Sequence, residues 1–520
     1  WLAVVDPGAR EPVDLVLLWA AGSPPERNTR GEFESLALVE RCRAEARTPD
    51  SLLQHQSVQQ RFPRVKTTYA IEPAMLDQLQ ILAGGFNFRE GGSVKNFPDS
   101  SAEARAAAAC LNSFKALAGS ANTEILSSPY AYVELPLLAR QGWADGNGQF
   151  RIGHDVLVES LSLPAVPRGT YAPGLSITTD SLRYLAATGG EYFVLKGSDR
   201  SSVQGRAPAT GAVYRLRDLS GERITGLFAN DDASLALFGE APDPAAFFAS
   251  LANAYAGGGD RLVIATAATP LPPLTASQRD VVYAGLEQQP WVRSLTLAEA
   301  RQKYNPSTEP STLLKYVDPL TGYLAETYFR KLEDAHEPYE DYRTAVDPDE
   351  PEVLRLSKKM YLAESFYWAG GGVSPEEANR GLAYLEDVKK LTRHEFERLT
   401  VKVDTPWVQG AESGEATVTV ANGNLYSFNV DIVLSGDGVR FPEWTDQRLR
   451  LETGKVEFRV PYVSGGWSRI EARIESRGHA LADDGAMVRP MTGRVWAVMI
   501  FVLAALFGGI AYVVVMVKRG

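Results

Sequence analysis

The feature that most constrains the fold is an alternation of short apolar runs with amphipathic stretches, from about residue 13 to residue 303. Continuous apolar runs such as "VDLVLLWA" at 13–20 are typical of parallel strands that are buried on both faces. The stretches between them have the pattern of crossover helices. This order predicts an α/β barrel of the TIM-like β/α type, with seven strands as one option. The expected strands are 13–20, 65–71, 123–130, 191–196, 224–230 and 261–268.

The rest of the chain changes character twice. Two helical patterns, 351–368 and 375–399, each begin at a proline, which the first turn of a helix tolerates. From Val401 the apolar period becomes two, with Gly and Asn between the runs, as in an antiparallel β-sandwich of the immunoglobulin or fibronectin type III kind. The predicted domains are the barrel at 1–303, a connector and helical segment at 304–400, and the sandwich at 401–485.

The C-terminal stretch from Val495 to Val517 contains 23 residues without a charged side chain. A helix of that length spans the roughly 30 Å of hydrocarbon in a bilayer. We therefore predict a transmembrane helix at 495–517 that contacts the lipid bilayer. Because the chain opens at Trp1 rather than at Met, we expect that a signal peptide has been removed. The expected localisation is then a single-pass cell-membrane protein whose bulk is extracytoplasmic, with a short cytoplasmic C-terminus.

Composition excludes some partners. The chain has 53 basic and 64 acidic residues, and a net charge of −11 argues against nucleic acid as a partner. Its five histidines are scattered, so the sequence predicts no metal site and no cofactor. Cys42 and Cys110 are the two cysteines, and the sequence leaves open whether they pair.

Five segments, in this order, resemble those of the family-57 glycoside hydrolases and of their polysaccharide-deacetylase relatives. "VKTTYAIEPAMLDQLQILAGGF" is similar to the family's "tfNltPvLLdQLedyA-G", and "PYAYVELPLL" is similar to "PYyHPilPLL". "PRGTYAPGLSITTDSLRYLAATGGEYFVL", "GLFANDDASLALFG" and "RLVIATAATP" resemble "prGlWpPEgavs…LaelGieyvv", "lFRDheLSD-IGF" and "vlialDGENP". The resemblance implies a glycosidase-like barrel and a carbohydrate as the ancestral ligand.

The positions that carry the family's chemistry differ in this chain. The family's nucleophile, the Glu of "WpPE", aligns with Gly174, and the His of "PYyHP" aligns with Tyr132. The Asp and Glu of "DGEN" align with Thr266 and Ala268. Retaining glycosidases need two carboxyl groups that face each other across about 5–5.5 Å. The resemblance therefore implies that the catalytic motifs are degenerate.

The remaining motifs do not restore the chemistry. The fourth segment keeps carboxylates at Asp231 and Asp232, but neighbouring residues on a strand point in opposite directions. A deacetylase needs an Asp and two His for its metal, and the barrel region has only His55 and His154. Tyr171 stands where the deacetylase loop has an Arg, whose charged fork a Tyr does not supply.

These observations predict a pseudoenzyme, a membrane-anchored protein whose barrel binds an envelope polysaccharide or a surface protein. Four aromatic residues are candidates for a platform that binds sugar rings, namely Trp19, Tyr132, Tyr171 and Trp143. The first alternative is an active glycoside hydrolase or polysaccharide deacetylase with a rebuilt site, for which the candidate catalytic residues are Asp231, Asp232, Glu134 and His154. The second alternative is a docking scaffold for a neighbouring membrane protein.

Overall fold

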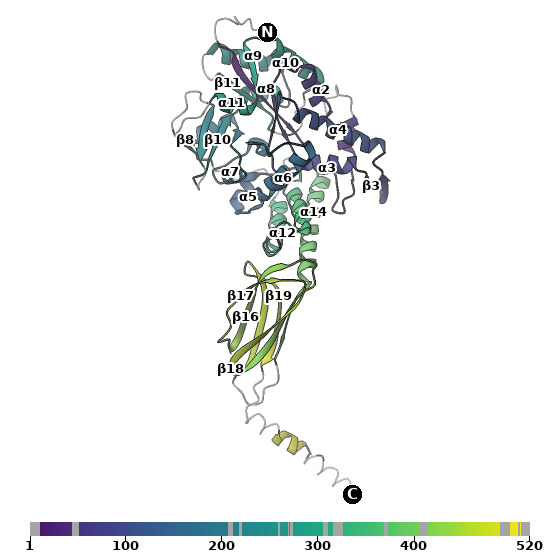
Figure 1. Ribbon diagram of the computed structural model, residues 1–520, viewed down its shortest axis with the longest axis vertical. Helices are drawn as coiled ribbons and strands as arrows, with labels where there is room; N and C mark the ends of the chain where they lie inside the picture. Colours follow the sequence, from purple (N-terminus) through teal and green to yellow (C-terminus); the bar gives the residue numbers. More distant parts are fainter. Residues whose placement is uncertain are drawn as a thin grey trace. The chain divides into compact units, whose positions relative to one another are not determined.

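The computed structural model describes residues 11–43, 51–205, 212–217, 221–257, 261–268, 270, 274–304, 310–315, 326–368, 373–405, 413–488, 500–507 and 510 (Figure 1). The chain divides into two compact units. The barrel unit comprises Trp1–Leu332 and Ser357–Leu385, and the β unit comprises Glu333–Leu356 and Glu386–Gly520. The two units are therefore interleaved along the sequence.

Seven parallel strands form the ring of the barrel unit. They are β1 (Val13–Ala21), β2 (Thr67–Ile71), β5 (Thr123–Leu126), β6 (Gly169–Thr170), β7 (Tyr192–Leu195), β10 (Arg223–Phe228) and β11 (Leu262–Thr266). Parallel pairing joins β11, β1, β2 and β5 in one sheet and β6, β7 and β10 in another.

A few backbone hydrogen bonds close the two seams between these sheets. Between β5 and β6, the amide of Ser127 donates to the carbonyl of Gly169 at 2.8 Å. Between β10 and β11, the amide of Asn230 donates to the carbonyl of Ile264, also at 2.8 Å. The ring is thus a (β/α)7 barrel, which confirms the predicted β/α barrel with its seven-strand option.

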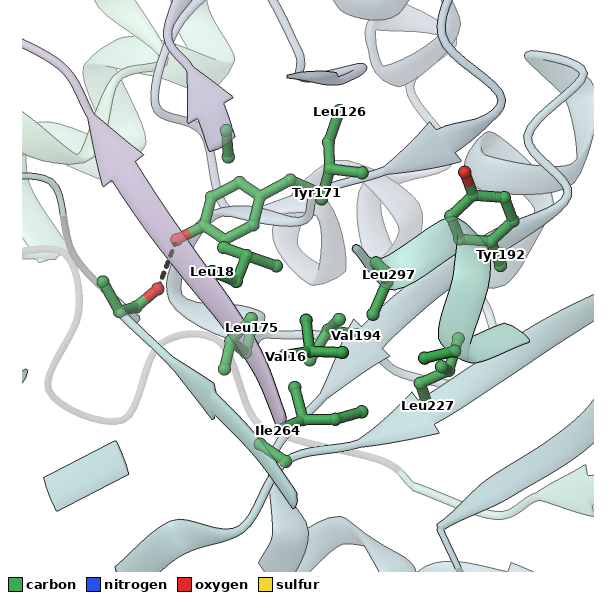
Figure 2. Packing of buried hydrophobic residues seen from close by; sticks show 14 of the residues in the cluster. Val16, Leu18, Leu126, Tyr171, Leu175, Tyr192, Val194, Leu227, Ile264 and Leu297 are labelled. Atoms are coloured by element: carbon green, nitrogen blue, oxygen red, sulfur yellow. Dashed lines mark hydrogen bonds between the residues drawn. The ribbon is translucent and has the colours of Figure 1, made fainter. Parts of the chain in front are cut away.

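The apolar strands are buried on both faces, one inside the barrel and the other against the surrounding helices. On β1, Val16 and Leu18 point into the barrel, where they join Val194, Leu227 and Ile264 from the other strands (Figure 2). The alternate residues of β1 face the surrounding helices and are equally buried, because helices cover the outside of a parallel barrel. This explains why the strand shows no polar alternation.

The barrel helices follow the crossover pattern. They are α1 (Ala37–Arg43), α2 (Gln54–Arg61), α3 (Pro73–Ala83), α4 (Ala102–Ala118), α5 (Leu135–Gln141), α6 (Asp145–Leu161), α7 (Leu182–Ala187), α8 (Asp231–Phe238), α9 (Pro244–Gly257), α10 (Ala276–Gln288) and α11 (Leu297–Lys303). The barrel unit also contains short strands and 3-10 turns. They are β3 (Phe86–Glu90), β4 (Ser93–Phe97), η1 (Pro173–Leu175), η2 (Gly197–Ser202), β8 (Val203–Gln204), β9 (Val213–Arg217), β12 (Val292–Leu295), β13 (Ser311–Leu313) and η3 (Phe366–Trp368).

Three helices contribute residues to both units. They are α12 (Glu326–Ala345), α13 (Pro351–Ala363) and α14 (Pro375–Phe396). The sequence predicted α13 and α14 but treated 304–350 as a connector without a period. In the structure α12 is helical over 20 residues despite Pro338 in its interior.

The β unit is an antiparallel β-rich domain. Its strands are β14 (Leu399–Asp404), β15 (Ser413–Asn422), β16 (Phe428–Arg440), β17 (Gln447–Leu451), β18 (Gly454–Ser476) and β19 (His479–Val488). The long β18 pairs with β15 along its first half and with β16 and β19 along its second half. Burial alternates strictly along β14, as the two-residue period predicted.

The predicted transmembrane helix is corrected by the structure. Most of Val495–Val517 lies outside the described residues, and the described helical stretch there is 500–507. Among the helices that the structure describes, none is long and apolar enough to cross a membrane.

A glycine in α6 gives a test of the packing that positions the barrel loops. A Cβ at Gly153 would clash with the carbonyl oxygen of Ser128 and lie 3.0 Å from the amide nitrogen of Tyr130. Because the obstacle is backbone, we expect Gly153→Ala to lower the free energy of unfolding by about 1–3 kcal/mol in denaturant titrations. The matched control is Gly257→Ala in α9, where a Cβ meets nothing within 4 Å. Equal stability of the two variants would contradict this packing.

Candidate functional site

Three positions that the family resemblance assigns to catalysis meet at the carboxyl end of the barrel. The amide of Gly174 donates to the Tyr132 hydroxyl and to the carbonyl of Ala268, each at 3.0 Å. The Tyr132 hydroxyl in turn donates to the Ala268 carbonyl at 2.5 Å. These residues come from the loops after β5, β6 and β11. The fold therefore brings together three positions that lie far apart in the sequence. We call these residues, Tyr132, Gly174 and Ala268, the triad.

A second tyrosine, Tyr171, also forms hydrogen bonds at this end of the barrel. The Tyr171 hydroxyl donates to the carbonyls of Ala267 and Ala268 at 3.2 and 3.0 Å, and Figure 2 shows its bond to the end of β11. Tyr132 and Tyr171 are 5% and 3% exposed. Burial raises the pKa of both phenols above its usual range, so both remain neutral hydrogen-bond donors.

The backbone at Gly174 is itself unusual. Gly174 lies within η1 with φ of +65°, a left-handed conformation that favours glycine over residues with a Cβ. The loop therefore presents a backbone amide at the position where the family has its nucleophile. The chemistry that these three positions can offer is hydrogen bonding.

A carboxyl group that sequence reasoning missed lies beside the triad. Glu72 follows β2 directly and precedes α3, and its Oε1 accepts from the amide of Tyr132 at 3.1 Å. Its Oε2 accepts from the amide of Ser23 and from the Tyr367 hydroxyl, each at 3.1 Å. The signal that could have revealed it is its place directly after a buried strand, since barrel active sites use those loops.

The environment of Glu72 changes its acidity. The side chain is buried, and burial raises its pKa from near 4.5 to about 8, although the donated hydrogen bonds from Ser23, Tyr367 and Tyr132 oppose the shift. A protonated Oε2 can donate to the Tyr367 hydroxyl while Oε1 still accepts from Tyr132. Glu72 is thus a carboxyl group that is able to hold a proton near neutral pH.

Glu134 is a second carboxyl group near the triad, and it is partly buried. Its Oε2 accepts from the Ser176 hydroxyl at 3.2 Å, two residues beyond Gly174. Burial raises the pKa of Glu134, while Lys196 and Lys315 act in the opposite direction. Of the four candidate catalytic residues, Glu134 is the one that the structure places beside the triad.

The other catalytic candidates occupy separate positions. Asp231 and Asp232 are exposed in the first turn of α8, where the Asp231 carboxylate accepts from the amides of Gly197 and Ser198 at 2.8 and 2.7 Å. His154 lies within α6, and burial lowers its pKa. Among the described residues, no hydrogen bond or ion pair joins any two of these side chains or links them to Glu134. Their catalytic role stays a prediction.

The four aromatic candidates also separate into different environments. Tyr132 and Tyr171 meet at the barrel end, as described above. Trp19 points outward from β1, 1% exposed, with the guanidinium carbon of Arg279 at 4.3 Å from its ring centroid and Tyr283 beside it. Trp143 is partly buried against the apolar cluster that includes Phe150. Their joint role in binding sugar stays a prediction.

The comparisons with known proteins agree with this geometry. Residues 46–234 match the sequence model of glycosyl hydrolase family 57, a range that contains Glu72, Tyr132 and Gly174. Over this range, which is less than half of the chain, the barrel unit is similar to that family. A search among curated proteins gives no match.

Solved structures with this fold include three enzymes. The α-amylase AmyC from Thermotoga maritima is 12% identical, with a TM-score of 0.52 over 73% of this chain and 93% of that one. The GH57-type branching enzyme from Pyrococcus horikoshii is 14% identical, with a TM-score of 0.53 over 74% and 89%. The 4-α-glucanotransferase from Thermococcus litoralis is 11% identical, with a TM-score of 0.51 over 90% and 85%. At such identities the likeness concerns the fold.

The raised pKa of Glu72 predicts a pH dependence of stability. Between pH 4.5 and about 8 the folded protein binds the Glu72 proton more tightly than the unfolded chain does, so this group's contribution to stability falls as pH rises through that window. Glu72→Gln removes this contribution. The free energy of unfolding of the wild type relative to the variant should therefore decrease from pH 5 to pH 8 and then level off.

Denaturant titrations of both proteins at pH 5, 6, 7, 8 and 9 measure this difference. The control is Glu240→Gln, which replaces an exposed glutamate and should leave the pH profile of the wild type unchanged. A constant difference between wild type and Glu72→Gln across the series would show that Glu72 titrates alike in both states.

Proposed function

We propose that the barrel binds a glycan without hydrolysing it. The observation that carries the proposal is the triad, because its three aligned positions offer a phenol, a backbone amide and a carbonyl, all bonded to one another. A retaining mechanism needs a carboxylate nucleophile and a facing acid at about 5–5.5 Å. Gly174 supplies no side chain to act as the nucleophile.

Polar groups around the triad support a binding role. Glu134, Ser176 and Lys196 lie on the loops after β5, β6 and β7 respectively, at the end of the barrel where ligands of this fold bind. Lys315 also acts on the Glu134 carboxyl group, and it forms an ion pair with Asp199 at 2.8 Å. Mixed donors and acceptors of this kind suit the hydroxyl groups of a sugar.

An active hydrolase with a rebuilt site is the second candidate, and one specific observation favours it. Glu72 and Glu134 flank Tyr132, and burial raises the pKa of both. Carboxyl groups with raised pKa values are a common mark of general acids. In this second candidate Glu72 and Glu134 replace the pair that was lost.

The test is retention on, and release from, insoluble polysaccharide. We expect the protein to be retained on isolated cell-wall polysaccharide, with no new reducing ends in the supernatant by mass spectrometry. Lys196→Ala should weaken retention by about tenfold, because a charge-assisted hydrogen bond contributes about 1.5–3 kcal/mol. The matched control is Asp232→Asn, an exposed residue of α8.

Three other outcomes would overturn the binding proposal. Release of sugars that disappears in Glu72→Gln and in Glu134→Gln would make the barrel a hydrolase. Retention that is equal in wild type and Lys196→Ala would place the binding surface elsewhere. Neither retention nor release would leave a protein partner as the ligand of this surface.

A further inference from the structure

A cavity lies on the barrel unit, and none of the triad residues lines it. Its volume is about 510 Å³, within the range of small-ligand sites. Four arginines line it, together with polar and aromatic side chains from α14. We call it the arginine pocket, and its main lining residues are Arg27, Arg30, Arg89, Arg380, Asn379 and Tyr384.

The loop that carries the first two arginines is held in one conformation. The Asn28 side-chain oxygen accepts from the amides of Arg30 and Glu32 at 3.0 and 3.1 Å. Gly31 adopts φ of +87°, which lets the turn close against Arg27. The Tyr384 hydroxyl donates to the carbonyl of Arg27 at 2.5 Å and ties the loop to α14. A loop fixed in this way loses little entropy when it binds a ligand.

Two of the four arginines are already neutralised. Arg89 forms a bidentate pair with Glu32 at 2.6 and 2.9 Å. Arg380 lies 3.9 Å from Glu34 and 3.8 Å from Glu376. These two guanidinium groups therefore hold the walls of the pocket, with their charge largely balanced.

Arg27 and Arg30 form no ion pair among the described residues. Arg27 donates from its Nε to the carbonyl of Gly31 at 3.3 Å, and its guanidinium lies 6.0 Å from the Phe33 ring centroid. Within the described ranges, neither Arg27 nor Arg30 has a carboxylate within 4.0 Å. A guanidinium group without an acidic partner binds a carboxylate through two parallel hydrogen bonds.

The loop after β1 connects the pocket with Glu72, which lies beside the triad. Ser23, whose amide donates to Glu72, precedes Arg27 by four residues, so their Cα atoms are at most about 14 Å apart. The same loop therefore carries both a bond to Glu72 and the pocket residues Arg27 and Arg30. Since the whole protein carries a net charge of −11, a nucleic acid is a poor occupant of this single basic cavity.

We infer that the arginine pocket binds the carboxylate of an acidic glycan, a polysaccharide with uronic-acid units. This inference rests on the proposed function and names the class of glycan. Arg27 and Arg30 bind the carboxylate. Asn379 and the ring of Tyr384 contact the sugar.

The experiment compares two probes that differ only at the carboxyl group, which is charged in one and esterified in the other. Affinities for an oligogalacturonate and for its methyl ester are measured by isothermal titration at fixed ionic strength. We expect the ester to bind at least tenfold more weakly, and Arg27→Ala and Arg30→Ala each to weaken oligogalacturonate binding about tenfold. The control Arg105→Ala replaces an exposed arginine of α4 and should bind as the wild type does.

Several results would overturn the inference. They are equal affinity for the ester, unchanged affinity in both arginine variants, or equal affinity for inorganic sulfate, which would mark a site for small anions. Retention of the protein on neutral glycogen without oligogalacturonate binding would leave the proposed function standing and end this inference. Oligogalacturonate binding that depends on Arg27 but not on Lys196 would support the pocket while removing the barrel end as the glycan site.

Discussion

The buried carboxyl of Glu72 holds the carboxyl end of the barrel together. It accepts hydrogen bonds from the loop after β1, from the loop after β5 and from the segment at Tyr367. An unpaired buried carboxylate costs several kcal/mol, so these three segments must lie where they satisfy it. The position of Tyr132, and through Tyr132 that of the triad, follows from this constraint.

The triad is a packed, hydrogen-bonded centre at the carboxyl end of the barrel. The hydroxyls of Tyr171 and Tyr132 bond there to the carbonyls of Ala267 and Ala268. Neutral side chains with satisfied donors are buried at much lower cost than unpaired carboxylates. The two phenols therefore favour stability at this end of the barrel.

The sequence predicted the barrel because its strands have a strong local signal. The observed β2, β7 and β10 begin within two residues of the predicted starts, whereas β6 has only two residues and no period that a pattern could reveal. Glu72 was missed because its partners Ser23, Tyr132 and Tyr367 lie 49, 60 and 295 residues away. The triad was predicted only through the family resemblance. The predicted transmembrane helix was wrong, since none of the helices that the structure describes is long and apolar enough to cross a membrane.

The interleaving of the two units bears on how the chain folds during synthesis. The seventh barrel strand ends at Thr266, yet Tyr367 and Tyr384, which bond to Glu72 and to the Arg27 loop, are made about a hundred residues later. Until residue 367 has been made, the Glu72 carboxyl in the nascent barrel lacks the hydrogen bond from the Tyr367 hydroxyl. Domains usually fold from the N-terminus as they are synthesised, but this barrel unit is complete only when its later segment, residues 357–385, has also been made.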